Sequence, residues 1–324
     1  MTRSIPPVAI IEPGYACYDA EAEALAGSGA ELVVIPEGAD LQAALAHHAP
    51  QVVFVRETLI GAELMQASPK LRGIVRYGVG VDGIDRDAAK AARIVVANVP
   101  DYGAEHEVSD HAVALYLALN RRLFQRDALV RRGDWGNAQA MPVPGRRGAT
   151  LGLIGFGKIA RQVCSKFQAL GFSRVLVSDP FVQDALLAEA GAERASLRNI
   201  CASADVVSLH APLTPDTRHA IGPAEIALFG PQTILLNVAR GGLVDEAALA
   251  AALADGRLFG AGVDVFEAEP VAPDHPLLAA PNCILSDHNA WYSEQSVREI
   301  QSRAAREARR IVDGQRPENW VNAW

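Results

Sequence analysis

The sequence predicts an α/β protein built from two doubly wound parallel sheets. Three observations support this fold class. The 324 residues are enough for two domains. Short β-branched runs alternate with alanine-rich stretches of helical length, first over about a hundred residues and again after residue 150. Hydrophobic residues make up 50% of the chain, so both halves have apolar surface to bury.

The first series of elements begins near the N-terminus. Its strand candidates are Val8–Ile11, Leu32–Ile35, Val52–Val55, Ile74–Arg76 and Ile94–Ala97. Apolar residues then recur at helical spacing through Gly103–Arg131, which predicts one long helix leaving the first domain. The segment Gly133–Gly148 contains two prolines and four glycines, which predicts an irregular strap.

The second series follows this strap. Its strand candidates are Leu151–Ile154, Val175–Ser178, Val206–Leu209, Ile234–Val238, Gly260–Val265 and Cys283–Ser286. Segments of helical length separate them, which predicts a second doubly wound sheet. A closing helix is predicted because apolar residues share one helical face, at Val297, Ile300, Ala304, Ala308 and Ile311.

Composition excludes several classes of function. The formal net charge is −8 and no block of lysines or arginines occurs, so we expect no nucleic-acid partner. No apolar run approaches the roughly 20 residues of a membrane helix, so we expect no membrane span. Prolines stand in the first seven residues, where a signal peptide needs an apolar stretch, so we expect a cytoplasmic protein.

The cysteines and histidines give no sign of a metal site. The four cysteines, Cys17, Cys164, Cys201 and Cys283, form no CxxC pair and have apolar neighbours. They are therefore predicted to be buried thiols rather than disulfides or ligands. The histidines outside the candidate site lack ligand-like spacing, so we expect no bound metal.

A glycine-rich turn follows the strand candidate at 151–154. In Gly155-Phe156-Gly157-Lys158-Ile159-Ala160, glycines let the backbone approach a pyrophosphate, and the following helix offers free N–H groups. Asp179 stands 22 residues after Gly157, where a carboxylate accepts hydrogen bonds from ribose hydroxyls and repels a 2′-phosphate. These residues predict NAD as cofactor, in preference to NADP. The alternative is a tight turn with an N-capping aspartate before Pro180.

Three charged residues follow strand candidates in the second half. His288 is suited to exchange a proton with the oxygen that forms when a ketone receives a hydride. Glu269 would orient the histidine ring and raise its pKa. Arg240 would bind a carboxylate and polarise the neighbouring carbonyl. The alternatives are a core or surface histidine, a capping or solvated carboxylate and a salt-bridge arginine.

Five ordered segments give this chain a resemblance to the D-isomer-specific 2-hydroxyacid dehydrogenase family over nearly its whole length. The segments are Arg76–Asp82, Leu151–Ala160, Asn237–Asp245, Gly262–Pro270 and Asp287–His288. The resemblance implies that Arg240, Glu269 and His288 are the substrate-binding arginine, the histidine-supporting glutamate and the acid/base histidine.

The resemblance also implies an architecture. A flavodoxin-like substrate domain, residues 1–101 plus 291–324, and a Rossmann NAD-binding domain, residues 102–290, would flank a cleft. The family is typically dimeric, so we expect a homodimer in which the long helix packs across a two-fold axis.

Further residues take roles from the same resemblance. Val79 and Gly80 would hold the substrate carboxylate through backbone N–H groups, the alternative being a plain turn. Tyr77 would line the substrate pocket or simply pack. Asp264 would lie near the nicotinamide carboxamide, and the carbonyl of Ala239 would accept a hydrogen bond from that carboxamide.

The resemblance also implies which residues contact the pyrophosphate and adenosine parts of the cofactor. Lys158 and Ile159 would offer backbone N–H groups to the pyrophosphate, although the Lys158 side chain could be merely solvated. His210 and Pro212 lie in the loop that would cross the adenosine and phosphate side. Thr217 would donate to a phosphate or, alternatively, cap a helix or turn.

Within the family, the segment Asn289–Gln295 most resembles the C-terminal-binding-protein branch and its bacterial relatives. Trp291 would contact the substrate side chain, which favours an apolar, medium-sized 2-keto acid; the alternative is a tryptophan that packs in the core. We expect an NAD-dependent D-2-hydroxyacid dehydrogenase. A 3-phosphoglycerate dehydrogenase is a variant of this hypothesis, and an NAD(H)-sensing dimeric binding protein of corepressor type is the alternative.

Overall fold

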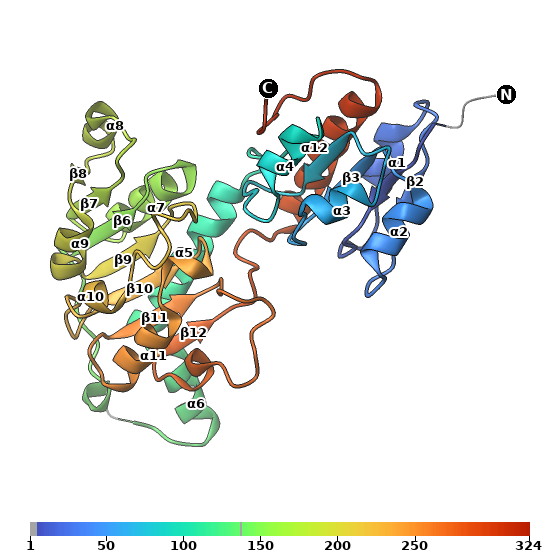
Figure 1. The fold of residues 1–324 in the computed structure, drawn as a ribbon. Helices are drawn as coiled ribbons and strands as arrows, with labels where there is room; N and C mark the ends of the chain where they lie inside the picture. Colours follow the sequence, from blue (N-terminus) through green and yellow to red (C-terminus); the bar gives the residue numbers. More distant parts are fainter. Residues whose placement is uncertain (1–4, 137) are drawn as a thin grey trace. The chain divides into compact units, whose positions relative to one another are not determined.

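The computed structural model describes residues 5–136 and 138–324. The chain divides into two compact units, a first unit of Met1–Gly103 with Ser293–Trp324 and a second unit of Ala104–Tyr292 (Figure 1). The predicted domain boundaries, after residues 101 and 290, fall two residues before these junctions. The binding roles given to the two domains stay predictions.

The first unit contains a five-stranded parallel sheet in the order β2-β1-β3-β4-β5. Its strands are β1 (Val8–Ile10), β2 (Leu32–Val34), β3 (Val52–Val55), β4 (Gly73–Arg76) and β5 (Val95–Ala97). This is the order of flavodoxin-like sheets, as expected. The predicted strands agree with the observed ones to within one residue, because each strand is a short run of mostly apolar, β-branched residues.

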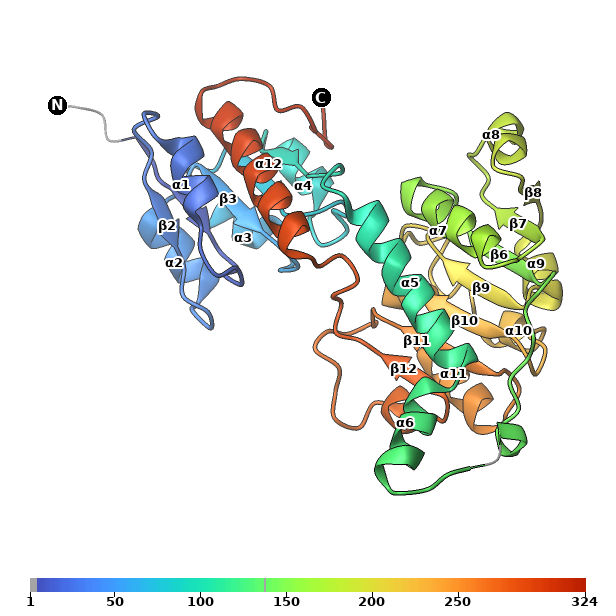
Figure 2. The same cartoon turned by 180° about the vertical axis from the view of Figure 1, so that it is seen from behind.

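Helices cover both faces of this sheet. They are α1 (Asp19–Leu25), α2 (Leu41–His48), α3 (Ala62–Gln66), α4 (Arg86–Ala91) and α12 (Glu294–Val312). The views from opposite sides show α1 and α12 on one face and α2, α3 and α4 on the other (Figures 1 and 2). The predicted closing helix is confirmed: Ser293 caps it, and Ile311 packs where Gly73 has no side chain.

The second unit contains a seven-stranded parallel sheet in the order β12-β11-β10-β9-β6-β7-β8. Its strands are β6 (Thr150–Ile154), β7 (Arg174–Ser178), β8 (Glu193–Arg194), β9 (Val206–Leu209), β10 (Ile234–Asn237), β11 (Gly260–Val263) and β12 (Cys283–Leu285). The strand order reverses between β6 and β9, as in Rossmann folds. Strand β8 was not predicted, because its two exposed charged residues carry no apolar pattern.

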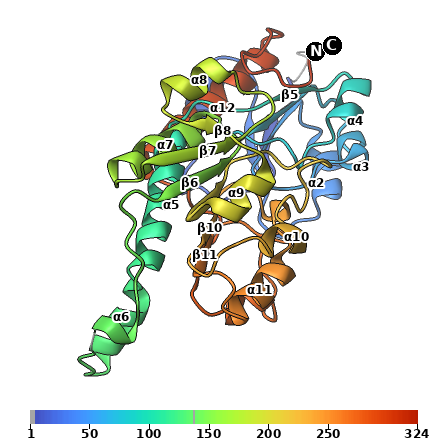
Figure 3. The same cartoon turned by 90° about the vertical axis from the view of Figure 1, so that its left-hand side faces the viewer.

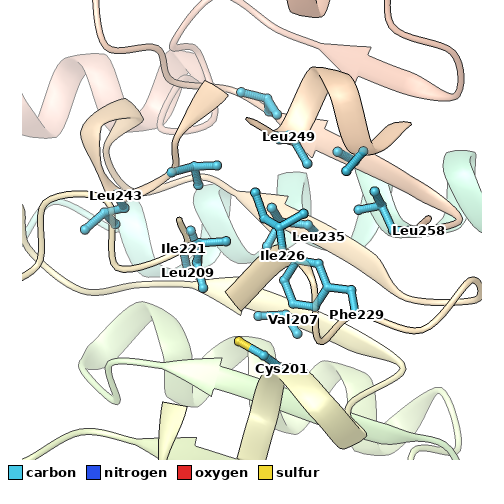
Figure 4. Packing of buried hydrophobic residues seen from close by; sticks show 14 of the residues in the cluster. Cys201, Val207, Leu209, Ile221, Ile226, Phe229, Leu235, Leu243, Leu249 and Leu258 are labelled. Atoms are coloured by element: carbon cyan, nitrogen blue, oxygen red, sulfur yellow. The ribbon is translucent and has the colours of Figure 1, made fainter. Parts of the chain in front are cut away.

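Helices pack on this sheet, and apolar side chains between the helices and the strands form the core of the unit. The helices that follow the first strand are α7 (Lys158–Ala169), α8 (Asp184–Glu189), α9 (Leu197–Ser203), α10 (Pro223–Ile226) and α11 (Glu246–Ala254). Figure 4 shows Val207 and Leu235 of the sheet beside Ile226 of α10 and Leu249 of α11. Burying such side chains stabilises the fold by about 1.5–3 kcal/mol each.

The prediction of a single helix over Gly103–Arg131 is wrong. The structure has two helices, α5 (Ala104–Asn120) and α6 (Leu123–Arg131), and Arg122 between them adopts a left-handed φ of 51°. The Arg122 guanidinium lies 4.6 Å from the centre of the Phe259 ring, and this tertiary contact favours the break. Helix α6 has no buried residue and lies at the far end of α5, away from the strands of its unit (Figure 3).

The strap is irregular apart from a short 3-10 turn, Ala138–Ala140, although Asn137 lies outside the described residues.

Cys164 and Cys201 are buried and Cys283 is half-buried, but the prediction of a buried thiol is wrong for Cys17. Cys17 is exposed because it lies in the loop between β1 and α1. Among the described residues, no helix is both long and apolar enough to cross a membrane.

Candidate active site

The predicted glycine turn lies at the carboxyl edge of the seven-stranded sheet. Gly155 directly follows β6 and has a φ of 88°, which favours glycine. A Cβ at this position would lie 2.8 Å from both the His210 carbonyl carbon and the Ala211 nitrogen. Glycine therefore lets the turn pack against the loop that follows β9. Gly157 precedes the first residue of α7, so the helix N-terminus faces the turn.

Asp179 follows β7 and is tied to the same turn. One carboxylate oxygen accepts from the Phe156 N–H at 2.8 Å, and the other accepts from the N–H groups of Phe181 and Val182. The carboxylate thus caps its own loop, as the alternative interpretation held. Oδ1 accepts two of these bonds, but Oδ2 accepts only one and keeps a second lone pair, so capping leaves an acceptor for a ribose hydroxyl. The glycine turn and Asp179 together fit a dinucleotide.

The loop after β9 contains three predicted cofactor contacts. The His210 ring shares a hydrogen bond with Ser208 Oγ at 2.8 Å, and burial lowers the pKa of His210 to about 3, so its imidazole is neutral. The Thr217 hydroxyl donates to the Pro212 carbonyl at 2.7 Å. This bond favours the turn-capping alternative for Thr217.

His288 and Glu269 form a hydrogen-bonded pair in the second unit. His288 Nδ1 lies 2.7 Å from one Glu269 oxygen, and the Phe266 N–H donates to the other oxygen at 2.9 Å. A carboxylate only accepts, so Nδ1 carries the proton and Nε2 remains for proton exchange. Burial alone would raise the pKa of Glu269, but the bonds from His288 and Phe266 and the nearby charges of His288 and Arg240 lower it.

Arg240 follows β10 and begins the 3-10 turn Gly241–Leu243. A Cβ at Gly241 would lie 1.8 Å from the backbone carbonyl carbon of Phe266, so only glycine allows this close approach. The close approach explains why the Arg240 charge acts on Glu269. An Arg240 Nη1 proton is donated to the Ala239 carbonyl at 2.7 Å. The structure therefore brings the three predicted catalytic residues together.

A second group of charged side chains supports the loop that carries Glu269, and the sequence analysis did not identify it. The Glu267 carboxylate accepts from Arg218 at 2.7 Å and pairs with His219. The Glu267 N–H donates to Glu246, which also pairs with His275 at 2.8 Å. Glu267 lies in the segment Gly262–Pro270, but its partners are distant in the sequence and outside that segment, so the sequence alone did not show that they meet.

Asp264 follows β11 and is almost fully buried, with 1% of its surface exposed. Its carboxylate accepts from Ser286 Oγ and from the backbone N–H groups of Asn289 and Ala290. These contacts fix the loop on which His288 lies. A position near a nicotinamide carboxamide stays a prediction for Asp264, as does the same contact for the Ala239 carbonyl.

In the first unit, the predicted carboxylate-binding turn follows β4. Val79 is 43% exposed, and its carbonyl accepts from the Asn98 side chain at 2.6 Å. Within residues 5–136 and 138–324, no acceptor bonds the N–H groups of Val79 and Gly80. Two adjacent N–H groups of this kind suit an anion.

Tyr77 precedes that turn and is 3% exposed. Its ring stacks on Phe54 with centroids 5.1 Å apart, and its hydroxyl donates to Glu21 at 2.6 Å. Gln301 of α12 donates to both Glu21 oxygens and to the Cys17 carbonyl. These contacts favour the packing alternative for Tyr77.

Trp291 is half-buried and meets the Tyr292 ring edge to face, with centroids 6.0 Å apart. Its contact with a substrate side chain stays a prediction. Across the described ranges, 5–136 and 138–324, no group of three or more His, Cys, Asp or Glu side chains could hold a metal ion.

Comparison with known proteins identifies relatives of this chain. Residues 113–290 match the family described as D-isomer specific 2-hydroxyacid dehydrogenase, NAD binding domain. The chain is 36% identical over 280 residues to a glycerate dehydrogenase of Methylorubrum extorquens, covering 84% of this chain and 86% of that one. It is 37% identical over 273 residues to a D-3-phosphoglycerate dehydrogenase of Methanocaldococcus jannaschii, covering 84% of this chain but only 51% of that protein.

A solved structure agrees with this result. The D-lactate dehydrogenase of Aquifex aeolicus, complexed with NAD and lactic acid, has a TM-score of 0.87 at 28% identity and covers 98% of this chain and 99% of its own. All three of these relatives have enzyme names. They give no support to the corepressor-type alternative, and they do not single out the C-terminal-binding-protein branch.

Proposed function

The chain belongs to the D-isomer specific 2-hydroxyacid dehydrogenase family, and from this premise we propose that it interconverts a 2-keto acid and the corresponding D-2-hydroxy acid. The observation that carries the proposal is the 2.7 Å pair of His288 and Glu269 beside Arg240. Such a pair can exchange a proton at the oxygen of a reacting carbonyl.

The chain's own residues would perform the following steps. A bound nicotinamide supplies the hydride for reduction of C2 and takes it back for oxidation. His288 Nε2 gives a proton to the C2 oxygen during reduction and removes it during oxidation. Glu269 stabilises the imidazolium form, and Arg240 polarises the C2 carbonyl. In the first unit, the N–H groups of Val79 and Gly80 are donors for the substrate carboxylate.

For the cofactor we propose NAD over NADP, bound through Gly155, Gly157 and the N–H groups of Lys158 and Ile159. Asp179 supports this preference because its carboxylate lies beside the glycine turn and would repel a 2′-phosphate. Asp179→Asn should lower the NAD to NADP ratio of kcat/KM by about tenfold or more, equivalent to about 1.4 kcal/mol. An unchanged ratio would contradict this assignment.

For the substrate we propose an unphosphorylated 2-keto acid. A phosphate would need a cation near the Val79 turn, and Arg76 and Arg56 are the candidates. Arg76 pairs with Glu57, and the Arg56 guanidinium lies 5.5 Å from the centre of the Tyr15 ring. The Glu57 carboxylate would repel a phosphate as well as neutralise Arg76.

The experiment that tests the proposed function is NADH oxidation with a panel of 2-keto acids. We expect turnover with hydroxypyruvate, glyoxylate or an apolar 2-keto acid that fits beside Trp291. The 2-keto acid formed by oxidising 3-phosphoglycerate should react more slowly. Absence of turnover with every acid would overturn the proposed function, and faster turnover of the phosphorylated acid would overturn only the substrate class.

We also propose that the enzyme is a homodimer. Helix α6 buries no residue within its own chain, and Leu123, Phe124 and Val130 on it are 53%, 62% and 58% exposed. Exposed apolar side chains gathered in this way suit an interface. A second copy of this chain is the occupant that the family resemblance favours. A monomeric mass by light scattering would contradict this.

A further inference from the structure

Hydrogen bonds lead from α5 to the loop that carries His288. His111 of α5 places Nε2 at 2.9 Å from Ser286 Oγ, just past β12. Ser286 Oγ in turn lies 2.6 Å from a carboxylate oxygen of Asp264, just past β11. Three separate elements of the second unit thus meet through His111, Ser286 and Asp264.

The chemistry of these groups fixes the direction of each bond. The Asp264 carboxylate has no proton to give, so Ser286 donates its hydroxyl proton to it. Because a hydroxyl carries a single proton, Ser286 Oγ must accept from its other partner, and His111 Nε2 therefore donates. The opposite histidine tautomer would place two acceptors face to face at 2.9 Å. His111 therefore keeps the Ser286 proton directed at Asp264.

Asp264 holds the backbone of three consecutive residues. Its carbonyl accepts from the His288 N–H at 2.8 Å, and its two carboxylate oxygens accept from the N–H groups of Asn289 and Ala290, each at 3.1 Å. His288 has a φ of 56°, a left-handed conformation that costs roughly 1–2 kcal/mol outside glycine. This conformation persists because the neighbouring bonds maintain it, and it sets the direction of the His288 ring.

We propose that His111 is a positioning residue for His288, acting through Ser286 and Asp264. The inference rests on the proposed function, in which His288 exchanges the proton. Without the imidazole, the Ser286 hydroxyl is free to rotate away, and Asp264 Oδ1 loses the shorter of its two hydrogen bonds, so only the 3.1 Å bond from the Asn289 N–H holds that oxygen. The loop at 288–290 then samples other conformations, and His288 reaches the substrate oxygen less often.

The test compares three variants on α5. His111→Ala removes the donor, whereas His111→Gln restores an N–H near the position of Nε2. His106→Ala is the control, because His106 is an exposed histidine on the same helix. We expect His111→Ala to lower kcat roughly 10- to 100-fold with little change in KM or in the Kd of NADH. His111→Gln should recover most of this loss, and His106→Ala should match the wild type.

Hydrogen exchange of the amides at 288–290 gives a readout that does not need turnover. We expect faster exchange there in His111→Ala and protection close to wild type in His111→Gln. Ser286→Ala should reproduce the His111→Ala loss, and the double variant should lose little more than either single one.

Three results would overturn the inference. They are an unchanged kcat in His111→Ala, a loss that glutamine does not rescue, and unaltered exchange at 288–290. A wild type that turns over no 2-keto acid would overturn the proposed function instead. In that case, the exchange measurement still decides whether His111 positions the loop.

Discussion

Glu21 in the first unit and Glu269 in the second are both carboxylates held by two hydrogen-bonding side chains or backbone groups, yet their pKa values move in opposite directions. Glu21 is fully buried, and its partners, Tyr77 and Gln301, are neutral, so burial raises its pKa. Burial also acts on Glu269, but bonds from His288 and Phe266 and the charge of Arg240 outweigh it and lower the pKa.

This difference distinguishes a carboxylate that can take part in catalysis from one that only stabilises the fold. A carboxylate with cationic partners stays charged and can stabilise a protonated histidine. A carboxylate among neutral partners is a structural acceptor, and ionisation there weakens the fold.

The largest expected effect comes from His288→Asn. Asparagine tolerates a positive φ and can donate to Glu269, so the loop should keep its conformation while the proton donor is lost. General acid catalysis typically contributes about 10²–10⁴-fold, and kcat should fall by that factor. Single-turnover kinetics with NADH measures it. A fall of less than tenfold would remove His288 from the proton-transfer role.

Glu269→Gln should have the next largest effect. Glutamine keeps an acceptor for His288 Nδ1 but cannot stabilise the imidazolium, so kcat should fall roughly 10- to 100-fold. The matched change in the first unit, Glu21→Gln, should leave kcat within about twofold. Equal losses of kcat in both variants would show that the two carboxylates do not differ in their role in catalysis.

Tyr77→Phe should affect stability rather than turnover. The variant removes one donor to the buried Glu21, which should lower the free energy of unfolding by about 1–3 kcal/mol. Denaturant titration measures this. A normal stability combined with a raised KM would instead support the prediction that Tyr77 lines the substrate pocket.

The smallest effect is a difference in pH dependence. The pKa of Glu269 is below its unfolded value of about 4.3, so its contribution to stability is present above that pH and is lost as pH falls through the folded pKa. The pKa of Glu21 is raised, so its contribution is present below about pH 4.3 and is lost as pH rises through the folded pKa.

Thermal unfolding of the two glutamine variants across acidic pH distinguishes these signs. The wild type should be more stable than Glu269→Gln near neutral pH, and this difference in stability should shrink as pH falls. Relative to Glu21→Gln, the wild type should instead lose stability as pH rises. If the stability differences between the wild type and the two variants change in the same direction with pH, the partners assigned to Glu21 and Glu269 are wrong.

Local pattern was sufficient to predict most strands and to indicate three candidate catalytic residues, whose roles come from the family resemblance and stay predictions. Buried parallel strands are mostly apolar runs, and Arg240, Glu269 and His288 lie in the loops that follow three of them. The break at Arg122 was missed because no glycine or proline marks it in the sequence, and the Arg122 contact with the Phe259 ring exists only in the folded chain. His111 and Ser286 are 175 residues apart, and Glu21 and Gln301 are 280 apart, so only the folded chain shows that they meet.

The first unit is assembled from the two ends of the chain, which has a consequence for biosynthesis. A ribosome delivers β1 to β5 early, but α12, which covers β3 and β4, emerges only after the whole second unit. Val96 and Asn322, which share a hydrogen bond, are 226 residues apart in the sequence. The contiguous second unit can therefore fold on the nascent chain first, while the sheet face that α12 covers in the first unit stays exposed until α12 has been made.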